Sequence, residues 1–424
     1  EAREILDRYG VAHVEFGRFT DSRRLQATWH GERVVDLDME FLWKGCPIEP
    51  TAVIEHERLL KPLSIPEPCT QAEWRQAVES VISHYHCCDQ SAAGVRFDTT
   101  VQGRTAIGPY GGRNHRMPTN LYVSAPLRGK PYGMVSTLAF NPFYGDVDPA
   151  AMARLMVIEA VTKAVVAGCS YKEAVLCDNF YTPRISPQTA WELSQMVDAI
   201  ADLSVELGIP FISGKDSSSG TFESKGRKID VPMTLAVMLM GRVPDVKRMV
   251  TKEFKRAGNK LVLIGPGGGD ALGGSVYADT HGQRGDRLFK LGNAAAVLAV
   301  WDAVLALHSE GRYVSGSAIA EGGLLLRLFE AAFGSGLGAR IDLDSQKVAR
   351  GDELLFGEFI GAVLLEVSPE VETGLANLKV PHQTIGEVIP EPQLVLARGA
   401  ATLWQQSVAE LETVWSKPFR EVVE

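Results

Sequence analysis

The chain has 424 residues, too many for one ordinary hydrophobic core, which predicts two domains of about 150 to 200 residues with some sequence left over. Hydrophobic residues at 45% and charged residues at 22% are typical of a soluble globular protein, and no apolar run approaches the roughly 18 residues of a membrane span. The net charge of −9 without a long basic cluster argues against a nucleic-acid-binding or membrane-binding surface.

The N-terminal sequence EAREILDRYG is a charged helical pattern and not a signal sequence. Six cysteines without a C-x-x-C pair indicate reduced thiols, so we expect a cytoplasmic protein. Because the chain begins with Glu1 and not with Met, we also expect it to have been cut from something longer.

A short pattern occurs near both ends of the chain. VAHVEFGRF (11–19) returns as VPHQTIGEV (380–388), with a helical pattern before each copy and an alternating β-hairpin pattern after it. The matching positions keep one constant offset: Val11 and Val380, His13 and His382, Gly17 and Gly386, Leu25 and Leu394. We interpret this as a tandem duplication of which the chain holds two tails but one body.

Composition divides the chain into four parts. The first tail copy (1–50) is followed by a proline-rich stretch without periodicity, which predicts an extended linker (51–69). Alternating helix and strand patterns then predict one α/β domain over 70–246 and a second over 247–424.

Histidine and cysteine cluster in HYHCCD (84–89), at the end of a helical pattern that starts at Glu73. Two His and two Cys could bind zinc, but the adjacent Cys87 and Cys88 cannot easily both reach one tetrahedral ion. A buried helix end is the alternative interpretation.

A buried helix is predicted between Asp148, a typical N-cap followed by proline, and Gly168, a typical stop. Its residues are apolar on nearly every face except for Glu159, with Lys163 four positions later. The residues alone leave two interpretations open, a buried ion pair or a carboxylate that binds a metal.

Glycine-rich and polar stretches suggest phosphate binding without matching a Walker loop. FISGKDSSSGTF (211–222) lacks the upstream glycine and has Asp216 where Ser or Thr is required, and GPGGGDALGGS (265–275) has Gly274 in place of lysine. CDNFYTP (177–183) is interpreted as a strand end with Asp178 and Asn179 in a loop, either contacting a ligand or forming a turn.

Glu321, Gly322 and Gly323 precede an apolar helix pattern. Glycines at this place allow backbone N–H groups to approach an anion at the helix start. Tight packing beneath the helix start would explain them equally well.

Several motifs, in order, resemble the second repeat of the phosphoribosylformylglycinamidine synthase (PurL) family, over about residues 70–400. They are NPFYGDVDPAAMARLMVIEAVTKAV, CDNFYTP, GIPFISGKDSSSGT, ALGGS, EGGLLLRLFEAAFGSGLGARIDL and LFGEFIGAVLLEV. The resemblance implies the two-domain α/β fold of aminoimidazole ribonucleotide (AIR) synthase, in which an N-terminal sheet domain pairs with a partner sheet and a C-terminal α/β domain packs beside it. Residues 1–50 resemble the end of the preceding repeat.

The resemblance also implies an ATP-dependent conversion of an amide to an amidine in purine synthesis, with ATP or ADP and Mg²⁺ as cofactors. It places the GKDS stretch near the nucleotide, with Lys215 and Ser217 suited to phosphate and Asp216 to a metal or water. The further nucleotide-binding residues expected are Asn179, Lys163, Gly322 and Gly323.

This sequence departs from the family at the metal positions, which fall on Asn120, Glu159, Lys163 and Glu321. The family has Asp, Glu, Asn and Asp there, so one charge is lost, one amide becomes a cation and one acid is lengthened. Mg²⁺ prefers an octahedral oxygen shell, which an ammonium group cannot supply. We therefore favour the Glu159–Lys163 ion pair and expect a weakened, remodelled or empty nucleotide site.

No catalytic residue is expected in this chain, because the family's His-Asn-His-Pro pattern is missing and His115 falls at the metal position. The expected partners are the first-repeat half and a glutaminase that supplies ammonia, and in an isolated chain a second copy paired through the N-terminal domains. The alternatives are a non-catalytic scaffold repeat or another AIR-synthase relative, such as selenophosphate synthetase or thiamine-monophosphate kinase.

Overall fold

The structure is a computed structural model that describes residues 1–46, 50–100, 102–266, 269–345 and 350–423. It forms two compact units, Glu1–Ala52 and Val53–Glu424, each described here by itself. Within the described residues, no helix has both the length and the apolar character to cross a membrane.

The first unit contains one β-hairpin and two short helices. They are α1 (Ala2–Arg8), β1 (Arg24–Trp29), β2 (Glu32–Asp38) and α2 (Met39–Lys44). Asp38 ends the hairpin and caps α2, since its carboxylate accepts hydrogen bonds from two backbone N–H groups of that helix. None of the described side chains in this unit is buried, so the unit has no hydrophobic core.

Both hairpins predicted from the terminal repeat are present. The C-terminal copy consists of β18 (Gln393–Arg398) and β19 (Ala401–Ser407), followed by α13 (Val408–Val423). At the constant offset of the repeat, the bounds of β1 and β2 fall on those of β18 and β19, and α2 starts where α13 starts. The two hairpins also share one pairing register and one irregularity at the same step.

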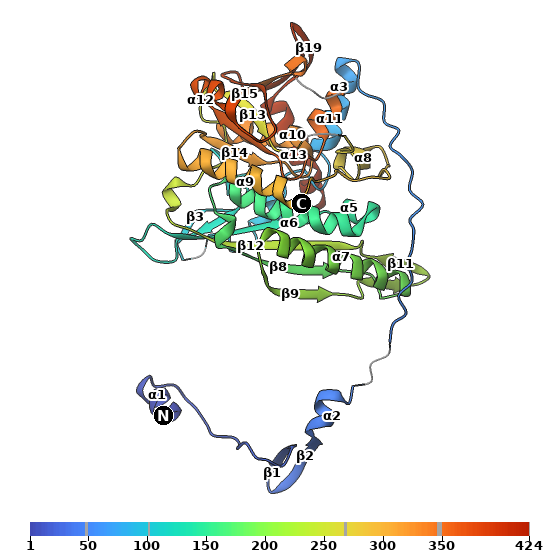
Figure 1. Ribbon diagram of the computed structural model, residues 1–424, viewed down its shortest axis with the longest axis vertical. Helices are drawn as coiled ribbons and strands as arrows, with labels where there is room; N and C mark the ends of the chain where they lie inside the picture. The colour runs from blue at the N-terminus through green and yellow to red at the C-terminus, as the bar shows by residue number, and fades with distance from the viewer. Residues whose placement is uncertain (47–49, 101, 267–268, 346–349, 424) are drawn as a thin grey trace. The chain divides into compact units, whose positions relative to one another are not determined.

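The first half of the second unit is built on a six-stranded sheet, in the order β3-β6-β7-β12-β8-β9. Its strands are β3 (Thr105–Ile107), β6 (Tyr122–Ser124), β7 (Gly133–Ala139), β8 (Ala174–Tyr181), β9 (Phe211–Ser217) and β12 (Thr234–Val243). Two long helices, α6 (Pro149–Val166) and α7 (Pro187–Leu207), lie over one face of this sheet (Figure 1).

Shorter elements surround this sheet. They are α3 (Gln71–Ile82), α4 (Ser91–Gly94), β4 (Tyr110–Gly111), β5 (Met117–Pro118), α5 (Pro142–Val147), η1 (Tyr171–Glu173), β10 (Thr221–Ser224), β11 (Arg227–Asp230) and η2 (Val246–Arg248). The predicted start of α6 is confirmed, because Asp148 accepts the N–H of Ala151 at 2.9 Å and Pro149 begins the helix. Gly168 follows the helix with φ of +98°, as expected for a stop.

The second half is built on a seven-stranded sheet, in the order β14-β16-β13-β17-β15-β18-β19. The strands not yet given are β13 (Lys260–Ile264), β14 (Ser315–Ala318), β15 (Gly338–Asp342), β16 (Val363–Val367) and β17 (His382–Ile389). The remaining helices are α8 (Val276–Thr280), α9 (Ala294–Ser309), α10 (Gly323–Ser335), η3 (Leu343–Ser345), α11 (Gly351–Phe356), α12 (Pro369–Gly374) and η4 (Leu375–Asn377).

The change from one sheet to the other falls between Val243 and Lys260, close to the boundary expected at residue 246. Contacts cross that division: α3, expected in the first α/β domain, contacts α8, α13 and β19 of the second. The two halves share one continuous core.

The proline-rich segment expected as a linker has no regular structure from residue 50 to 69, and from Val53 onward it belongs to the second unit. Arg58 pairs with Glu192 of α7 at 2.6 Å and donates to the Gly145 carbonyl at 2.5 Å. Glu67 accepts the N–H of Gly351 at 2.8 Å. The segment is thus an extended strap bound along its length.

Candidate nucleotide site

Glu159 and Lys163 lie over one face of the six-stranded sheet, whereas Asn179, Lys215 and Ser217 lie on its other face. Glu159 and Lys163 lie on α6, which packs against β7 and β12, and Thr137 of β7 on that face donates to the Ala160 carbonyl at 2.8 Å. Asn179 and Lys215 are paired neighbours in β8 and β9 on the other face. The structure therefore brings the α6 residues together but not with the GKDS stretch.

Glu159 and Lys163 form the ion pair favoured from the sequence. The Lys163 ammonium lies 2.6 Å from a Glu159 carboxylate oxygen and donates to the Leu138 carbonyl at 2.9 Å. Neither carboxylate oxygen of Glu159 accepts a directed hydrogen bond from a described residue, although the side chain is only 1% exposed. The contact is thus mainly Coulombic, in a site that excludes water.

Burial dominates the ionisation of this pair. Burial and the nearby Glu321 carboxylate raise the pKa of Glu159 to about 7, against the opposing effect of Lys163. Burial lowers the pKa of Lys163, but Glu159 and Glu321 outweigh it, so that this pKa is raised. Lys163 therefore stays charged at neutral pH, whereas Glu159 gains or loses its proton near pH 7.

A second buried charge cluster, missed by the sequence analysis, adjoins this pair. Lys252 lies 2.7 Å from Glu330, and the Arg327 guanidinium lies 3.3 Å from the same carboxylate. Burial lowers the pKa of Lys252 to about 8, although Glu330 opposes this shift, and the Arg327 charge affects both Lys252 and Glu159. A usable indication was present, because Arg327 and Glu330 interrupt the apolar helix LLLRLFEAAF at helical spacing.

The backbone groups expected to bind a phosphate are already occupied. The Gly322 N–H donates to Glu358 at 2.9 Å, and the Gly323 N–H donates to the Ala320 carbonyl at 3.0 Å. Gly323 has φ of +62°, and an added Cβ would lie 2.7 Å from the backbone carbon of Phe356. Tight packing under the start of α10, the second interpretation from the sequence, accounts for the glycine pair.

Glu358 is a buried acid that sequence reasoning did not single out. It accepts hydrogen bonds from the Tyr144 hydroxyl at 2.5 Å and from the N–H groups of Val276 and Gly322 at 3.0 and 2.9 Å. Burial raises its pKa to about 8 against the effect of these donors. The carboxylate thereby joins α5, α8 and the start of α10.

Asn120 does not approach the Glu159 carboxylate through any recorded contact. Its side-chain amide donates to the Gly316 carbonyl of β14 at 2.9 Å and is buried. The next residue of that strand, Ser317, has a buried hydroxyl for which no described residue is a partner. Across the described ranges, no three His, Cys, Asp or Glu side chains are grouped to hold a metal ion. Asn120, Glu159 and Glu321 as metal ligands stay a prediction.

The GKDS stretch is a strand and not a loop. Lys215, Asp216 and Ser217 lie in β9, the edge strand that pairs in parallel with β8. The Lys215 ammonium donates to the Ser217 hydroxyl at 3.0 Å, which donates to Asn179 at 2.9 Å. The expectation that Asn179 and its neighbour Asp178 lie in a loop is wrong, because sheet pairing continues β8 to Tyr181.

The HYHCCD segment fits a buried helix end. Cys87 and Cys88 are buried after the last turn of α3, and His84 lies 2.8 Å from Asp279. His115 lies in a turn with φ of +50°. Residues 267–268 of the second glycine-rich stretch lie outside the described part of the chain.

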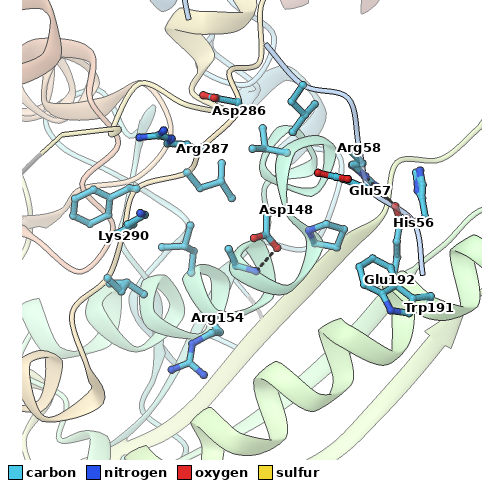
Figure 2. Close-up of a pocket in the computed structure, with 18 of the residues that line it drawn as sticks. His56, Glu57, Arg58, Asp148, Arg154, Trp191, Glu192, Asp286, Arg287 and Lys290 are labelled. Carbon is cyan, nitrogen blue, oxygen red and sulfur yellow. Dashed lines mark hydrogen bonds and ion pairs between the residues drawn. The ribbon is translucent and has the colours of Figure 1, made fainter. Parts of the chain in front are cut away.

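A cavity of about 1050 Å³ lies at the start of α6, between the strap and residues 286–292 (Figure 2). Its walls carry both signs of charge, with Arg287 and Lys290 opposite Glu57 and Glu192. Asp148 already occupies the start of the helix as its cap. None of the predicted site residues, all of which are described, lines this cavity.

Comparisons with known proteins bear directly on the family resemblance. Residues 256–398 match the family model for the C-terminal domain of AIR synthase related proteins. The phosphoribosylformylglycinamidine synthase subunit PurL of Deinococcus radiodurans is 27% identical over 99% of this chain and 56% of its own length. The Thermus thermophilus subunit is 28% identical over 99% of this chain and 56% of its own.

The chain is similar to PurL subunits over nearly its whole length. It spans about half the length of the curated PurL subunits it matches. Among solved structures, Thermotoga maritima PurL complexed with FGAR has a TM-score of 0.61 at 18% identity, over 80% of this chain and 53% of that one. A HypE–HypF complex has a TM-score of 0.52 at 16% identity, over 70% and 94%. The α/β fold is AIR-synthase-like, as the PurL motifs predicted.

Proposed function

We propose that this chain supplies the second AIR-synthase-like repeat of a cytoplasmic phosphoribosylformylglycinamidine synthase. The reaction is the ATP-dependent conversion of the FGAR amide to the FGAM amidine in purine biosynthesis. ATP phosphorylates the amide oxygen and ammonia then displaces the phosphate. The observation that carries the proposal is the 27% identity to PurL subunits over 99% of this chain.

Because the chain spans about half of those subunits, its partner in the proposal is a polypeptide that contains the first repeat. Ammonia comes from a glutaminase, in keeping with the PurLQS assembly solved from Thermotoga maritima. No residue of this chain is assigned a catalytic role.

In this proposal the nucleotide site of the second repeat is weakened. Lys163 neutralises Glu159, Asn120 is engaged by Gly316, and the N–H groups of Gly322 and Gly323 are occupied. These contacts leave Mg²⁺ without the oxygen shell that it prefers. Lys163 remains the group able to contact a phosphate directly, as a point charge.

The open face of the six-stranded sheet suits pairing with a partner sheet. Along β7 and β12, large apolar side chains on this face alternate with buried ones and remain exposed: Met134, Leu138, Met238 and Met240. Leu138 and Met238 are direct cross-strand neighbours, which makes the apolar patch continuous. Lys215, Asn179 and Ser217 share this face, so pairing would bring the GKDS stretch to the seam. The same face makes self-association possible in an isolated chain.

A turnover assay tests the proposal. We expect no FGAM from this chain with FGAR, ATP and ammonia, and FGAM production once the first-repeat polypeptide is added. Turnover by this chain alone, or none after the addition of a folded first-repeat polypeptide that binds it, would contradict the proposal.

The alternative, a non-catalytic scaffold repeat, predicts a different turnover when variants of this chain are assayed in the assembled complex. If the second repeat contributes only its sheet face, Lys215→Ala and Glu159→Gln leave the turnover of the assembled complex unchanged. The proposed contributing role predicts a fall in turnover for Lys215→Ala, and Lys225→Ala on the β10–β11 turn is the matched exposed control.

A further inference from the structure

The cavity of about 1050 Å³ at the start of α6 has a fixed wall on the side of the strap. The Ile54 N–H donates to the Pro187 carbonyl at 3.1 Å, and Arg58 pairs with Glu192, which is 7% exposed. Buried charged contacts of this kind hold an extended segment in one place. This wall is therefore in position before any ligand binds, and the volume suits a small organic molecule or a short peptide.

A second wall, formed by residues 286–292, carries two cations. Leu288 and Phe289 are 5% and 6% exposed and hold this segment in the hydrophobic core. Arg287 and Lys290 lie beside them, line the cavity and are exposed. Neither has an ion-pair partner among the described residues. An anionic group of a ligand would give these two cations the partner that the described chain does not supply.

The strap carries the opposite charge. Glu55 and Glu57 are exposed, line the cavity and form no ion pair with a described residue. Figure 2 shows Glu57 on one side of Asp148, and Arg287 with Lys290 on the other. The strap acids repel a ligand that is only anionic, and the two cations repel one that is only cationic. The cavity therefore favours a ligand with an anion at one end and a cation at the other.

Groups along the strap also lack hydrogen-bond partners. The N–H groups of residues 55–59 donate to no described residue, and a buried ring nitrogen of His56 has no described partner either. Asp148 accepts the Ala151 N–H with one carboxylate oxygen, and no described donor bonds to the other. Extended backbone with unpaired N–H and C=O groups pairs readily with a second extended peptide. A peptide carries such groups along its whole length, so it complements this wall better than other zwitterions do.

We propose that this cavity binds a short peptide with free termini. The carboxylate group of the peptide binds Arg287 and Lys290. Its ammonium group binds Glu55 and Glu57 on the strap. Its apolar side chains pack on the floor of the cavity, where Leu155 is 2% exposed. Burial of this floor and one charge-assisted contact at each end together set the affinity.

This inference goes beyond the proposed function and does not rest on it. None of the residues expected to bind nucleotide or metal, all of which are described, lines the cavity. Peptide binding there needs neither ATP nor a first-repeat polypeptide, so the turnover assay and a peptide titration succeed or fail independently.

Saturation-transfer NMR on the full chain tests the proposal. The probes are peptides of alternating Leu and Ala, from two to five residues long, with free termini. We expect at least one of them to bind with a Kd below about 1 mM. Acetylation of its N-terminus and amidation of its C-terminus should each weaken binding about tenfold, because each removes one charge-assisted contact.

Two double variants assign each end of the peptide to its wall. Arg287→Gln with Lys290→Gln should weaken binding of the free peptide about tenfold and leave the affinity for the C-amidated peptide unchanged. Glu55→Gln with Glu57→Gln should weaken binding of the free peptide and leave the affinity for the N-acetylated peptide unchanged. Lys247→Gln is the matched control, since Lys247 is exposed, lies outside the cavity and has no ion-pair partner among the described residues. It should change none of these affinities.

Three results would overturn the proposal. The first is the absence of saturation transfer with every probe at about 10 mM. The second is equal affinity for free peptides and for peptides blocked at both ends, which would assign the cavity to an internal segment of a partner protein. The third is an energetic coupling between Glu57→Gln and Lys290→Gln in urea denaturation of the ligand-free chain, because the two walls would then pair with each other.

Discussion

Glu159 forms an ion pair with Lys163 among the buried apolar side chains of α6. The sequence indicated this contact because the two residues are four positions apart on one helix. The other buried charges escaped prediction for the opposite reason. Lys252 meets Glu330, and Glu358 meets Tyr144, across long separations in the chain that only the packed fold brings together. The spacing of residues along a helix predicts pairs that are close in the sequence. The partner of a buried charge that is distant in the sequence can be identified only from the tertiary structure.

The pH dependence of the Glu159 pair has a defined sign. Its folded pKa of about 7 lies above the ordinary value of 4.5, so between these pH values the folded state binds more protons than the unfolded state. The stability that this group contributes is complete below about pH 4.5 and is lost as the pH rises through 7.

Lys163→Met tests the pair. At pH 8 it removes the cation that opposes protonation of the buried Glu159, so the folded state has to bury an unpaired charge or take up a proton, and we expect the free energy of unfolding to fall by about 3 kcal/mol. At pH 5 the protonated carboxyl needs no cation, so the loss should be clearly smaller. Urea denaturation at both pH values measures this difference.

Arg154→Met is the matched control on the same helix, because Arg154 pairs with Glu206 at 3.3 Å in a half-exposed site. It should cost less than about 1 kcal/mol at either pH. An equal loss for Lys163→Met at pH 5 and pH 8 would show that Glu159 does not carry the buried charge.

The sequence predicted the starts and ends of helices more reliably than it predicted the strands at the edge of the six-stranded sheet. Asp148, Pro149 and Gly168 act through local backbone geometry, and the structure confirms all three around α6. Asp178 and Asn179 were placed in a loop because such residues favour turns. Pairing of β8 with β12 and β9 overrides that preference, which a single sequence does not reveal.

Gly323→Ala tests whether the glycine pair before α10 serves packing. A methyl group there meets the Phe356 backbone at 2.7 Å, in addition to the strain of φ at +62°. We expect a loss of about 3 kcal/mol or more in the free energy of unfolding, measured by denaturant titration without any ligand.

Gly208→Ala is the control, since Gly208 has a similar φ of +69° but no atom within 4 Å of an added Cβ. It should cost only about 1 kcal/mol, the strain of the left-handed conformation. Equal losses in the two variants would remove packing as the reason for Gly323, and the anion-binding interpretation would return.

At the scale of the whole molecule, the family motifs predicted the AIR-synthase-like fold, and the similarity to PurL subunits and solved PurL structures confirms it. The sequence predicted less well where the expected nucleotide-binding and metal-binding residues lie in space. The family pattern places them along the sequence, whereas in the structure Glu159 and Lys163 lie over one face of the six-stranded sheet and Lys215 and Ser217 lie on the other.

We propose that the second-repeat site is weakened because Lys163 stands where the family has a metal-binding amide and Asn120 where it has an acid. Calorimetric titration of the chain with ADP, with and without Mg²⁺, tests it most directly. We expect weak binding, with a Kd above about 100 μM, that Mg²⁺ does not strengthen. Micromolar binding that requires Mg²⁺ and is lost in Glu159→Gln would contradict it.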